Sequence, residues 1–190
     1  MQPSKYIRAP HPKTNIRPTV EAIKGALKHG WVAQKKIHGH RAQIHVPATP
    51  DNPLLIFNRQ GKLHKRPILP ALGRELRRIF TPAQAWNVID GEWIKRDGGN
   101  DHIYVFDFLR REGTLLTDCT FPDRFALLPR VFGSEMVTTL PILTTVSDCM
   151  TVLAEEEEQI EGLIFRSTTT KGFSDTSIIR CRKGTTLYQG

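Results

Sequence analysis

Short apolar runs that end in glycine or in charged residues recur along this chain, and they predict β-strands. The run 42–46, Ala-Gln-Ile-His-Val, alternates apolar and polar positions as a half-buried strand does. Further runs, rich in β-branched and aromatic side chains, lie at 54–57, 87–94, 102–109, 159–166 and 177–183. The runs 87–94 and 102–109 flank a glycine-containing turn at 96–100, so they predict a hairpin.

The side chains of a strand point alternately to its two faces, so the predicted hairpin has two distinct surfaces. Tyr104, Phe106 and Phe108 are expected to share one face of the second strand. On the first strand, Glu92 is expected on the same face as Asp90. A carboxylate is therefore predicted within a largely apolar pair of strands.

Apolar residues at helical spacing predict four helices. Thr19 is expected to cap the first, residues 70–80 form the second, Pro122 starts the third and Ser147 caps the fourth. The polar face of the second helix holds Arg74, Arg77 and Arg78. The glutamate run 155–158 is expected to be the solvated end of the fourth helix, because four negative charges oppose the helix dipole there.

The composition is that of a soluble globular protein. Hydrophobic residues make up 39% and charged residues 24% of the 190 positions, and no apolar run reaches the length of a membrane span. The three cysteines are far apart, which is typical of a reducing compartment, so a cytoplasmic location is expected. Residues 1–18 are basic and proline-rich, without the apolar core of a secretory signal, and are expected to lack regular structure.

The net charge of +8 is the feature of the composition that most suggests a partner. It predicts a polyanionic partner, with nucleic acid as the first choice. An inert basic surface explains the charge equally well, so charge alone does not separate these two interpretations.

The segment 36–41, Lys-Ile-His-Gly-His-Arg, contains a candidate nucleophile. It precedes an alternating run, and its glycine indicates a turn, so Lys36 is expected at a strand end that faces a cleft. A lysine amine is a poor nucleophile while it is protonated, and neighbouring cations favour its neutral form. Lys35, His40 and Arg41 are close in sequence. Read alone, the same segment also fits a solvated surface lysine beside a turn.

Six short motifs follow one another along the chain, each at a predicted strand or strand end. They are Lys-x-x-Gly-x-Arg at 36–41, Asn-Arg-x-Gly-Lys at 58–62, Asp-Gly-Glu at 90–92, Phe-Asp-Phe-Leu at 106–109, Glu-Gly-Leu-Ile-Phe-Arg at 161–166 and Arg-x-Arg-Lys at 180–183. In this order and spacing they resemble the covalent nucleotidyltransferase superfamily, which comprises ATP-dependent DNA ligases, RNA ligases and mRNA capping enzymes. The resemblance covers roughly residues 31–183.

The resemblance implies the chemistry of ATP-dependent ligases. Lys36 would attack the α-phosphate of ATP to give a lysyl-AMP phosphoramidate, AMP would pass to a 5′-phosphate end, and a 3′-hydroxyl would displace it. Mg²⁺ or Mn²⁺ is also implied, with Glu161 as a metal ligand. The implied nucleotide-binding residues are Gln34, Arg41, Arg59, Glu92, Phe106, Arg180 and Arg182. The basic residues expected to contact nucleic acid are Lys62, Lys183, Arg74, Arg77 and Arg78.

Within this set the resemblance assigns separate roles. Gln34 would lie near the adenine edge, Phe106 would stack on adenine, and Glu92 would bind the ribose hydroxyls, while the arginines would surround the phosphates. The residues by themselves also fit a core position for Phe106 and an ordinary strand-end charge for Glu161.

Different motifs resemble DNA ligases and RNA ligases, so they indicate different nucleic-acid substrates. The segments 90–92, 105–109, 111–116 and 121–124 resemble the central stretch of ATP-dependent DNA ligases. His38, where those enzymes usually have Asp, resembles instead RNA ligases of the phage end-repair and trypanosome RNA-editing kind. The prediction is a ligase that acts on nicked duplex DNA, with RNA-containing ends and an RNA ligase as the alternative. A nucleic-acid-binding module whose catalytic site has decayed is the third interpretation.

The expected fold is α+β, a nucleotidyltransferase (ATP-grasp-like) domain of two mainly antiparallel sheets with flanking helices. One adenylyltransferase domain is expected over 1–190, acting as a monomer and without a membrane partner. Two departures from the family stand out near the end of the chain. Arg180 and Arg182 replace lysines with planar guanidinium groups. The OB-fold domain that follows in DNA ligases is not expected within these 190 residues, so the expectation is either a pared-down ligase or a catalytic core whose second domain is missing or separate.

Overall fold

The computed structural model describes residues 5–95 and 101–184. The chain divides into two compact units. The first unit comprises Met1–Ala9, Gly39–Leu140 and Lys171–Phe173, and the second comprises Pro10–His38, Pro141–Thr170 and Ser174–Gly190. Each contains one sheet and its own helices, which confirms the α+β class with two mainly antiparallel sheets. That the two units together form one adenylyltransferase domain over residues 1–190 stays a prediction.

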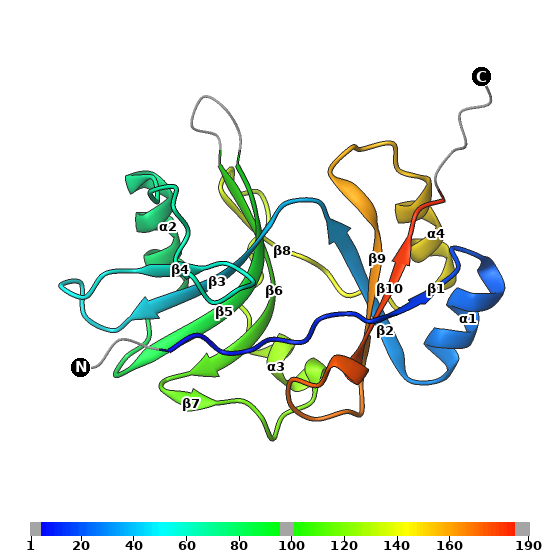
Figure 1. The fold of residues 1–190 in the computed structure, drawn as a ribbon, viewed down its shortest axis with the longest axis horizontal. Coiled ribbons are helices and arrows are strands. Elements are labelled where there is room, and N and C mark those ends of the chain that lie inside the picture. The colour runs from blue at the N-terminus through cyan, green and yellow to red at the C-terminus, as the bar shows by residue number, and fades with distance from the viewer. Residues whose placement is uncertain (1–4, 96–100, 185–190) are drawn as a thin grey trace. The chain divides into compact units, whose positions relative to one another are not determined.

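The second unit is built on a four-stranded sheet in the order β1-β10-β9-β2 (Figure 1). Its strands are β1 (Thr14–Ile16), β2 (Trp31–Ile37), β9 (Ile160–Ser167) and β10 (Ile178–Arg182). Strand β9 pairs antiparallel with both neighbours, whereas β1 pairs parallel with β10. The expectation that residues 1–18 lack regular structure is therefore wrong for Thr14–Ile16. The edge of β10 offers unpaired backbone groups, and this segment satisfies them.

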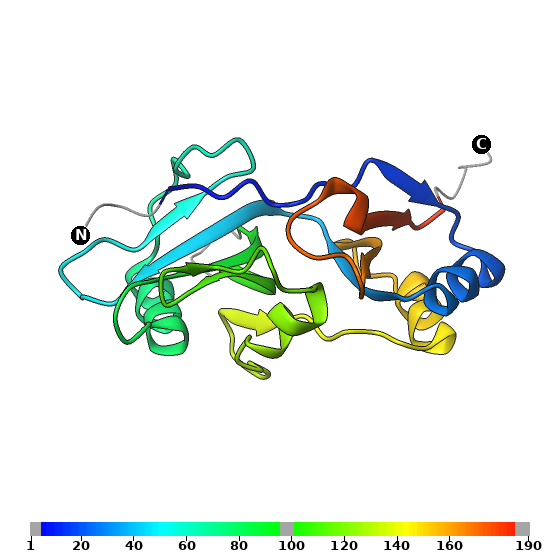
Figure 2. The ribbon, with the colours of Figure 1, turned by 90° about the horizontal axis from the view of Figure 1, so that it is seen from below.

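Two helices, α1 (Val20–Lys28) and α4 (Val146–Ala154), lie together against the strands of this sheet (Figure 2). Ile23 of α1 and Cys149 and Val152 of α4 are buried. Because these buried residues are on the sheet side of the helices, they form the apolar layer of the second unit. A 3₁₀ helix at Asp175–Ser177 precedes β10.

Threonine side chains cap the N-termini of both helices. Thr19 caps α1, as predicted. Ser147 as the cap of α4 is wrong, because Thr145 accepts a 3.1 Å hydrogen bond from the backbone nitrogen of Asp148. Thr145 has the extended backbone that an N-cap requires, so the helix starts two residues earlier. The run 155–158 follows the helix, with Glu155 as its C-cap.

The first unit contains a six-stranded sheet with the path β4-β3-β5-β6-β7, and β8 also pairs with β6. Its strands are β3 (His40–Pro47), β4 (Leu55–Phe57), β5 (Trp86–Ile94), β6 (His102–Arg111), β7 (Thr114–Leu115) and β8 (Val137–Thr139). The neighbours are antiparallel except for β6 and β8. The predicted pairing of β5 with β6 is confirmed, while the predicted turn at 96–100 lies outside the described residues.

The predicted common face of Tyr104, Phe106 and Phe108 is wrong. The register between β5 and β6 shifts between Asp90, which pairs with Asp107, and Gly91, which pairs with Val105, so Phe106 is one extra residue in β6 at this point. Because an extra residue reverses the alternation that follows it, Phe108 joins Val105 in the core cluster of this unit, and Phe106 does not. Alternation in the sequence alone gives no sign of such a bulge.

Two helices complete the first unit, α2 (Pro70–Phe80) and α3 (Phe121–Ala126). The prediction of an amphipathic α2 is confirmed, since its buried face packs in the core cluster that includes Trp93. Among the helices of the described ranges, none has the length and apolar character needed to cross a membrane.

Helix α3 has Thr120 as its N-cap, and Pro122 lies in its first turn, which confirms the predicted proline at the start of this helix. It is fixed to β6 by a buried ion pair, in which the guanidinium of Arg124 donates to both oxygens of Asp107 at 2.9 and 3.0 Å. The same guanidinium donates to the carbonyl oxygens of Cys119 and Gly172. One side chain therefore joins a strand, a helix and two loop segments.

Candidate active site

Lys36 lies next to the end of β2 in the second unit, which confirms its predicted place at a strand end. It pairs with Gly162 of β9, but the next residue, Ile37, pairs with Ile160. Glu161 is thus one extra residue in β9 at this point. Its carboxylate accepts a hydrogen bond from the amine of Lys36.

Glu161 binds a second donor as well, because its other oxygen contacts Nδ1 of His38. Burial raises the pKa of Glu161, but the hydrogen bonds from Lys36 and His38 and their charges outweigh burial, so the pKa lies below its ordinary value. The carboxylate is therefore ionised at neutral pH, and Nδ1 of His38 is the donor. The His38 ring itself is largely exposed.

The register of the sheet shows which other side chains share the face of Lys36. Cross-strand partners project to the same face. Lys36, Gly162 and Arg182 form one such row, and Gln34, Ile164 and Arg180 form the next. Lys35 projects to the opposite face and contacts Glu155 at the end of α4, so the row of Lys36 lies on the face away from the helices, here called the open face. The prediction that Arg180 and Arg182 share a side is confirmed.

The polar residues of the open face are held by specific partners. Gln34 is 1% exposed, and its side-chain oxygen accepts a 3.0 Å hydrogen bond from Nε of Arg166. Arg180 donates from Nε to the side-chain oxygen of Asn15 at 2.6 Å, whereas Arg182 is exposed. Arg166 was not assigned a role from the sequence, although it is the last residue of the motif 161–166.

The helix side of the same sheet holds Lys183, which the sequence assigned to nucleic-acid binding. Its amine donates to the backbone carbonyl of Glu155. Lys35 pairs with the carboxylate of Glu155 at 2.7 Å. The expectation of a solvated glutamate run is therefore wrong for Glu155, because both basic residues converge on the C-cap of α4.

In the first unit, Arg41 connects two of the predicted site residues. Its guanidinium donates through Nε to Asp90 at 2.5 Å and contacts the second carboxylate oxygen through Nη2. The same group lies 5.2 Å from the ring centroid of Phe106. Burial lowers the pKa of Arg41, but Asp90 outweighs burial and the pKa is raised. Asp90, which the sequence assigned only to a motif, thus positions Arg41.

Glu92 and Arg59 occupy the same unit. Glu92 is half-buried and is the cross-strand partner of Arg41 between β5 and β3. Arg59 lies in the turn after β4, where Gly61 has a φ of +74°. The hydroxyl of Tyr6 donates to the backbone oxygen of Arg59 at 3.2 Å. A residue of the N-terminal segment thus contacts the turn that carries Arg59.

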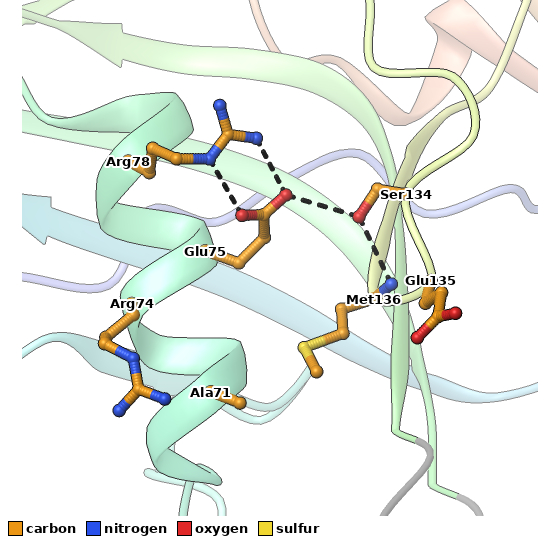
Figure 3. Close-up of a pocket in the computed structure, with 7 residues that line it drawn as sticks. All are labelled: Ala71, Arg74, Glu75, Arg78, Ser134, Glu135 and Met136. Carbon is orange, nitrogen blue, oxygen red and sulfur yellow. Dashed lines mark hydrogen bonds and ion pairs between the residues drawn. The ribbon is translucent and has the colours of Figure 1, made fainter.

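Helix α2 and residues 134–136 line a pocket of about 350 Å³ (Figure 3). Arg78 forms two hydrogen bonds with Glu75, at 2.8 and 2.9 Å, and Ser134 donates to the same carboxylate. Arg74 lines the pocket, but Arg77 instead donates to a backbone carbonyl at position 52. The predicted arginine face of α2 is therefore partly neutralised by a carboxylate of the helix itself.

The residues present fit a divalent metal of the kind that binds nucleotides. Mg²⁺ in such sites takes one or two carboxylates and completes its shell with water and substrate phosphates. Within 5–95 and 101–184, no group of three or more His, Cys, Asp or Glu side chains could hold an ion alone. Glu161, ionised and on the open face, provides the one carboxylate that this mode requires.

Comparisons with known proteins identify the same family and fold. A family model described as RNA ligase matches residues 29–182. The mycobacterial DNA ligase D complexed with ATP and MES is similar in structure, with a TM-score of 0.62, 16% identity, and coverage of 92% of this chain and 60% of that chain. The ligase domain of M. tuberculosis LigD is similar with a TM-score of 0.56 and 16% identity, and the match covers 78% of this chain and 53% of that chain. An archaeal ATP-dependent RNA ligase is similar with a TM-score of 0.54 and 14% identity, and the match covers 92% of this chain and 48% of that chain.

At such identities the structural likeness concerns the fold. The chain spans between 48% and 60% of the length of these three structures. No curated protein matches its sequence.

Proposed function

This chain belongs to the RNA ligase family, and we propose that it is an ATP-dependent polynucleotide ligase that joins 5′-phosphate to 3′-hydroxyl ends through a lysyl-AMP intermediate. The observation that supports this proposal most directly is the contact between Lys36 and Glu161 on the open face of the four-stranded sheet. A solvated surface lysine would need no such partner. Here a β-bulge, a carboxylate and a histidine are all arranged around one amine.

The first step of the proposed reaction takes place at Nζ of Lys36. The amine gives a proton to solvent and attacks the α-phosphorus of ATP, a P–N bond forms as the bond to the bridging oxygen breaks, and pyrophosphate leaves with the bonding electrons. Glu161 holds the amine in place. Because its pKa is lowered, its carboxylate is a weak base and is better suited to orienting the amine than to removing the proton.

Negative charge on the phosphates needs neutralisation during this step. Arg182 lies in the same row as Lys36, and Arg180 lies in the next row, so both are proposed to contact phosphate oxygens. Glu161 would hold Mg²⁺ or Mn²⁺, and the ion neutralises phosphate charge when it is bound. A guanidinium can bind two phosphate oxygens at once, so arginines at these positions can replace the lysines that the family mostly has.

The adenosine is assigned to the residues named from the sequence. Phe106 is proposed to stack on adenine and Glu92 to bind the ribose hydroxyls. Arg41 supports the first assignment, because it holds one side of the Phe106 ring and is itself fixed by Asp90. Gln34 is proposed to contact the adenine edge, with Arg166 fixing the orientation of its amide. Arg59 is proposed to contact phosphate.

We propose nicked duplex DNA as the substrate, on the resemblance of the central stretch to DNA ligases. An RNA ligase is the second candidate, and His38 is the observation that favours it. His38 contacts Glu161, whose other oxygen accepts from the amine of Lys36, so the RNA-ligase-like residue of the first motif shares a partner with the proposed nucleophile. Both candidates use the same chemistry, so they differ in the strand ends that the enzyme accepts.

Two assays test the proposal. Incubation with ATP labelled in the α-phosphate and Mg²⁺ should label the protein covalently, and GTP should not replace ATP. Sealing of nicked duplexes whose two ends are DNA or RNA, in all four combinations, then identifies the substrate. Absence of labelling would contradict the proposed enzyme and would leave a nucleic-acid-binding module whose site has decayed.

A further inference from the structure

A cluster of cationic side chains lies in the first unit, at the end of β5. The amine of Lys95 is 3.2 Å from Nδ1 of His64 and 4.7 Å from the ring centroid of Trp93. The ring of His64 packs edge-on against Trp93, with 5.1 Å between centroids. The ammonium of Lys95 is therefore held by two ring systems and does not extend freely into solvent.

The partners of His64 define the tautomer of its ring in this cluster. Its Nε2 lies 2.9 Å from the backbone oxygen of Arg41, which can only accept, so Nε2 bears the proton. Nδ1 is then a lone pair, and it accepts from the ammonium of Lys95. Burial lowers the pKa of His64, and the charges of Lys95 and His40 lower it as well, while the hydrogen bond to the backbone of Arg41 acts against them; the pKa is lowered, which favours a neutral ring at neutral pH. The ring orients the lysine without adding charge.

The other cation of the cluster is Arg66, which pairs with Asp101 at 3.2 Å. Burial lowers the pKa of Lys95, repulsion from Arg66 lowers it further, and Asp101 acts against both. Arg66 and Lys95 are thus two cations close enough to repel each other, and the carboxylate of Asp101 is paired with Arg66. Lys62 and Lys65 are exposed in the loop that leads to Arg66, so positive charge exceeds negative charge at this surface.

We propose that Lys62, Lys65, Arg66 and Lys95, here called the cationic rim, bind backbone phosphates of the polynucleotide that the enzyme joins. The inference rests on the proposed function and identifies the surface that holds its nucleic-acid substrate. Of these residues only Lys62 was expected from the sequence to contact nucleic acid.

Electrostatics favours binding of a phosphodiester at the cationic rim over binding at the arginine face of α2. An anion between Lys95 and Arg66 would relieve their mutual repulsion, and the preset position of the ammonium reduces the entropy lost on binding. On α2, Arg78 is paired with Glu75, as Arg66 is with Asp101 in the rim, so the rim differs from α2 by Lys95, whose ammonium is held by the rings of His64 and Trp93. A nucleic-acid backbone carries closely spaced negative charges and so fits several cations that belong to the loop 62–66 and to the end of β5.

The test measures affinity of the full chain for a nicked DNA duplex by fluorescence anisotropy at several salt concentrations. For Lys95→Gln we expect weaker binding at low salt and a slope of log affinity against log salt that is smaller by about 1, because each lost phosphate contact removes about 0.9 from that slope. Lys95→Arg keeps the charge and should keep the slope. Lys24→Gln, which removes an exposed charge from α1, is the matched control and should leave the slope unchanged.

Two results would overturn the inference. One is a wild-type slope in Lys95→Gln. The other is a raised KM for ATP in covalent labelling with no change of the slope, which would make Lys95 a positioning residue for the nucleotide through His64 and Arg41. Failure of the wild-type chain to become labelled by ATP would instead contradict the proposed function, while a smaller slope would still support the rim.

Discussion

Glu161 accepts a hydrogen bond from the amine of Lys36 because β9 has one residue more than β2 at this point. Without the bulge, a residue next to Gly162 would project to the opposite face of the sheet, away from Lys36. The bulge instead brings both charged groups to the open face. His38 then reaches the same carboxylate after the end of β2.

Lys36→Ala should abolish covalent labelling by ATP, because alanine has no nucleophile that could form the phosphoramidate. Lys35→Ala is the matched control. Lys35 projects to the helix face and pairs with Glu155, so its loss should slow labelling without abolishing it. Gel detection of the labelled protein measures both, and complete loss in Lys35→Ala would move the nucleophile by one residue.

Glu161→Gln should destabilise the protein in a manner that depends on pH. The pKa of Glu161 is lowered in the folded state, so its contribution to stability is present above its ordinary value of 4.5 and is lost as the pH falls through the folded value. The difference in the free energy of unfolding between wild type and variant should therefore be largest near neutral pH and shrink in acid. Urea titrations at several pH values measure it, and a difference independent of pH would refute the ion pair.

Gly162→Ala should disrupt the four-stranded sheet. Gly162 has a φ of +141°, and an added Cβ would lie 2.2 Å from the carbonyl oxygen of Cys181 in β10. We expect a loss of at least about 3 kcal/mol in the free energy of unfolding, together with loss of labelling.

Gly25→Ala is its control, because Gly25 lies inside α1, and within the described ranges no atom beyond its chain neighbours and the nearby helix backbone lies within 4 Å of an added Cβ. It should stabilise by about 0.5–1 kcal/mol. Urea denaturation compares the two variants, and equal effects would contradict the strain at position 162.

Arg124→Met should destabilise the first unit by about 3–5 kcal/mol, because it leaves the buried carboxylate of Asp107 without its partner. Arg78→Met removes a guanidinium that also pairs with a carboxylate, Glu75, but in an exposed position on α2, and it should change stability little. Thermal unfolding of both variants measures the contrast. Similar shifts in Tm would show that burial of the Arg124 pair is not what matters.

His38→Asp should keep labelling by ATP while lowering the sealing of RNA-containing ends relative to all-DNA ends. His38 donates to Glu161, whereas an aspartate cannot donate and adds a negative charge that favours protonated Lys36. Sealing rates on matched nicks give the ratio. An unchanged ratio, or a wild-type enzyme that refuses every ribonucleotide end, would rule out this role for His38.

Much of the fold could be predicted from the sequence, because hydrophobic periodicity and capping residues act over a few neighbours. Helix α1 with its Thr19 cap and the amphipathic α2 follow from such local patterns. So does the position of Lys36 at a strand end beside a glycine turn. The order of six motifs identified the family because each motif requires particular residue types at a short spacing.

The remaining features depended on tertiary structure, because they arise where segments distant in sequence meet. The bulges at Phe106 and Glu161 exist only in register with a neighbouring strand, and β1 forms only because β10 offers it an edge. The ion pair of Arg41 with Asp90 and the contact of Lys95 with His64 likewise join residues from different elements. A sequence determines which side chains are available. Cross-strand register and burial decide which of them meet, because those depend on long-range pairing that no local pattern encodes.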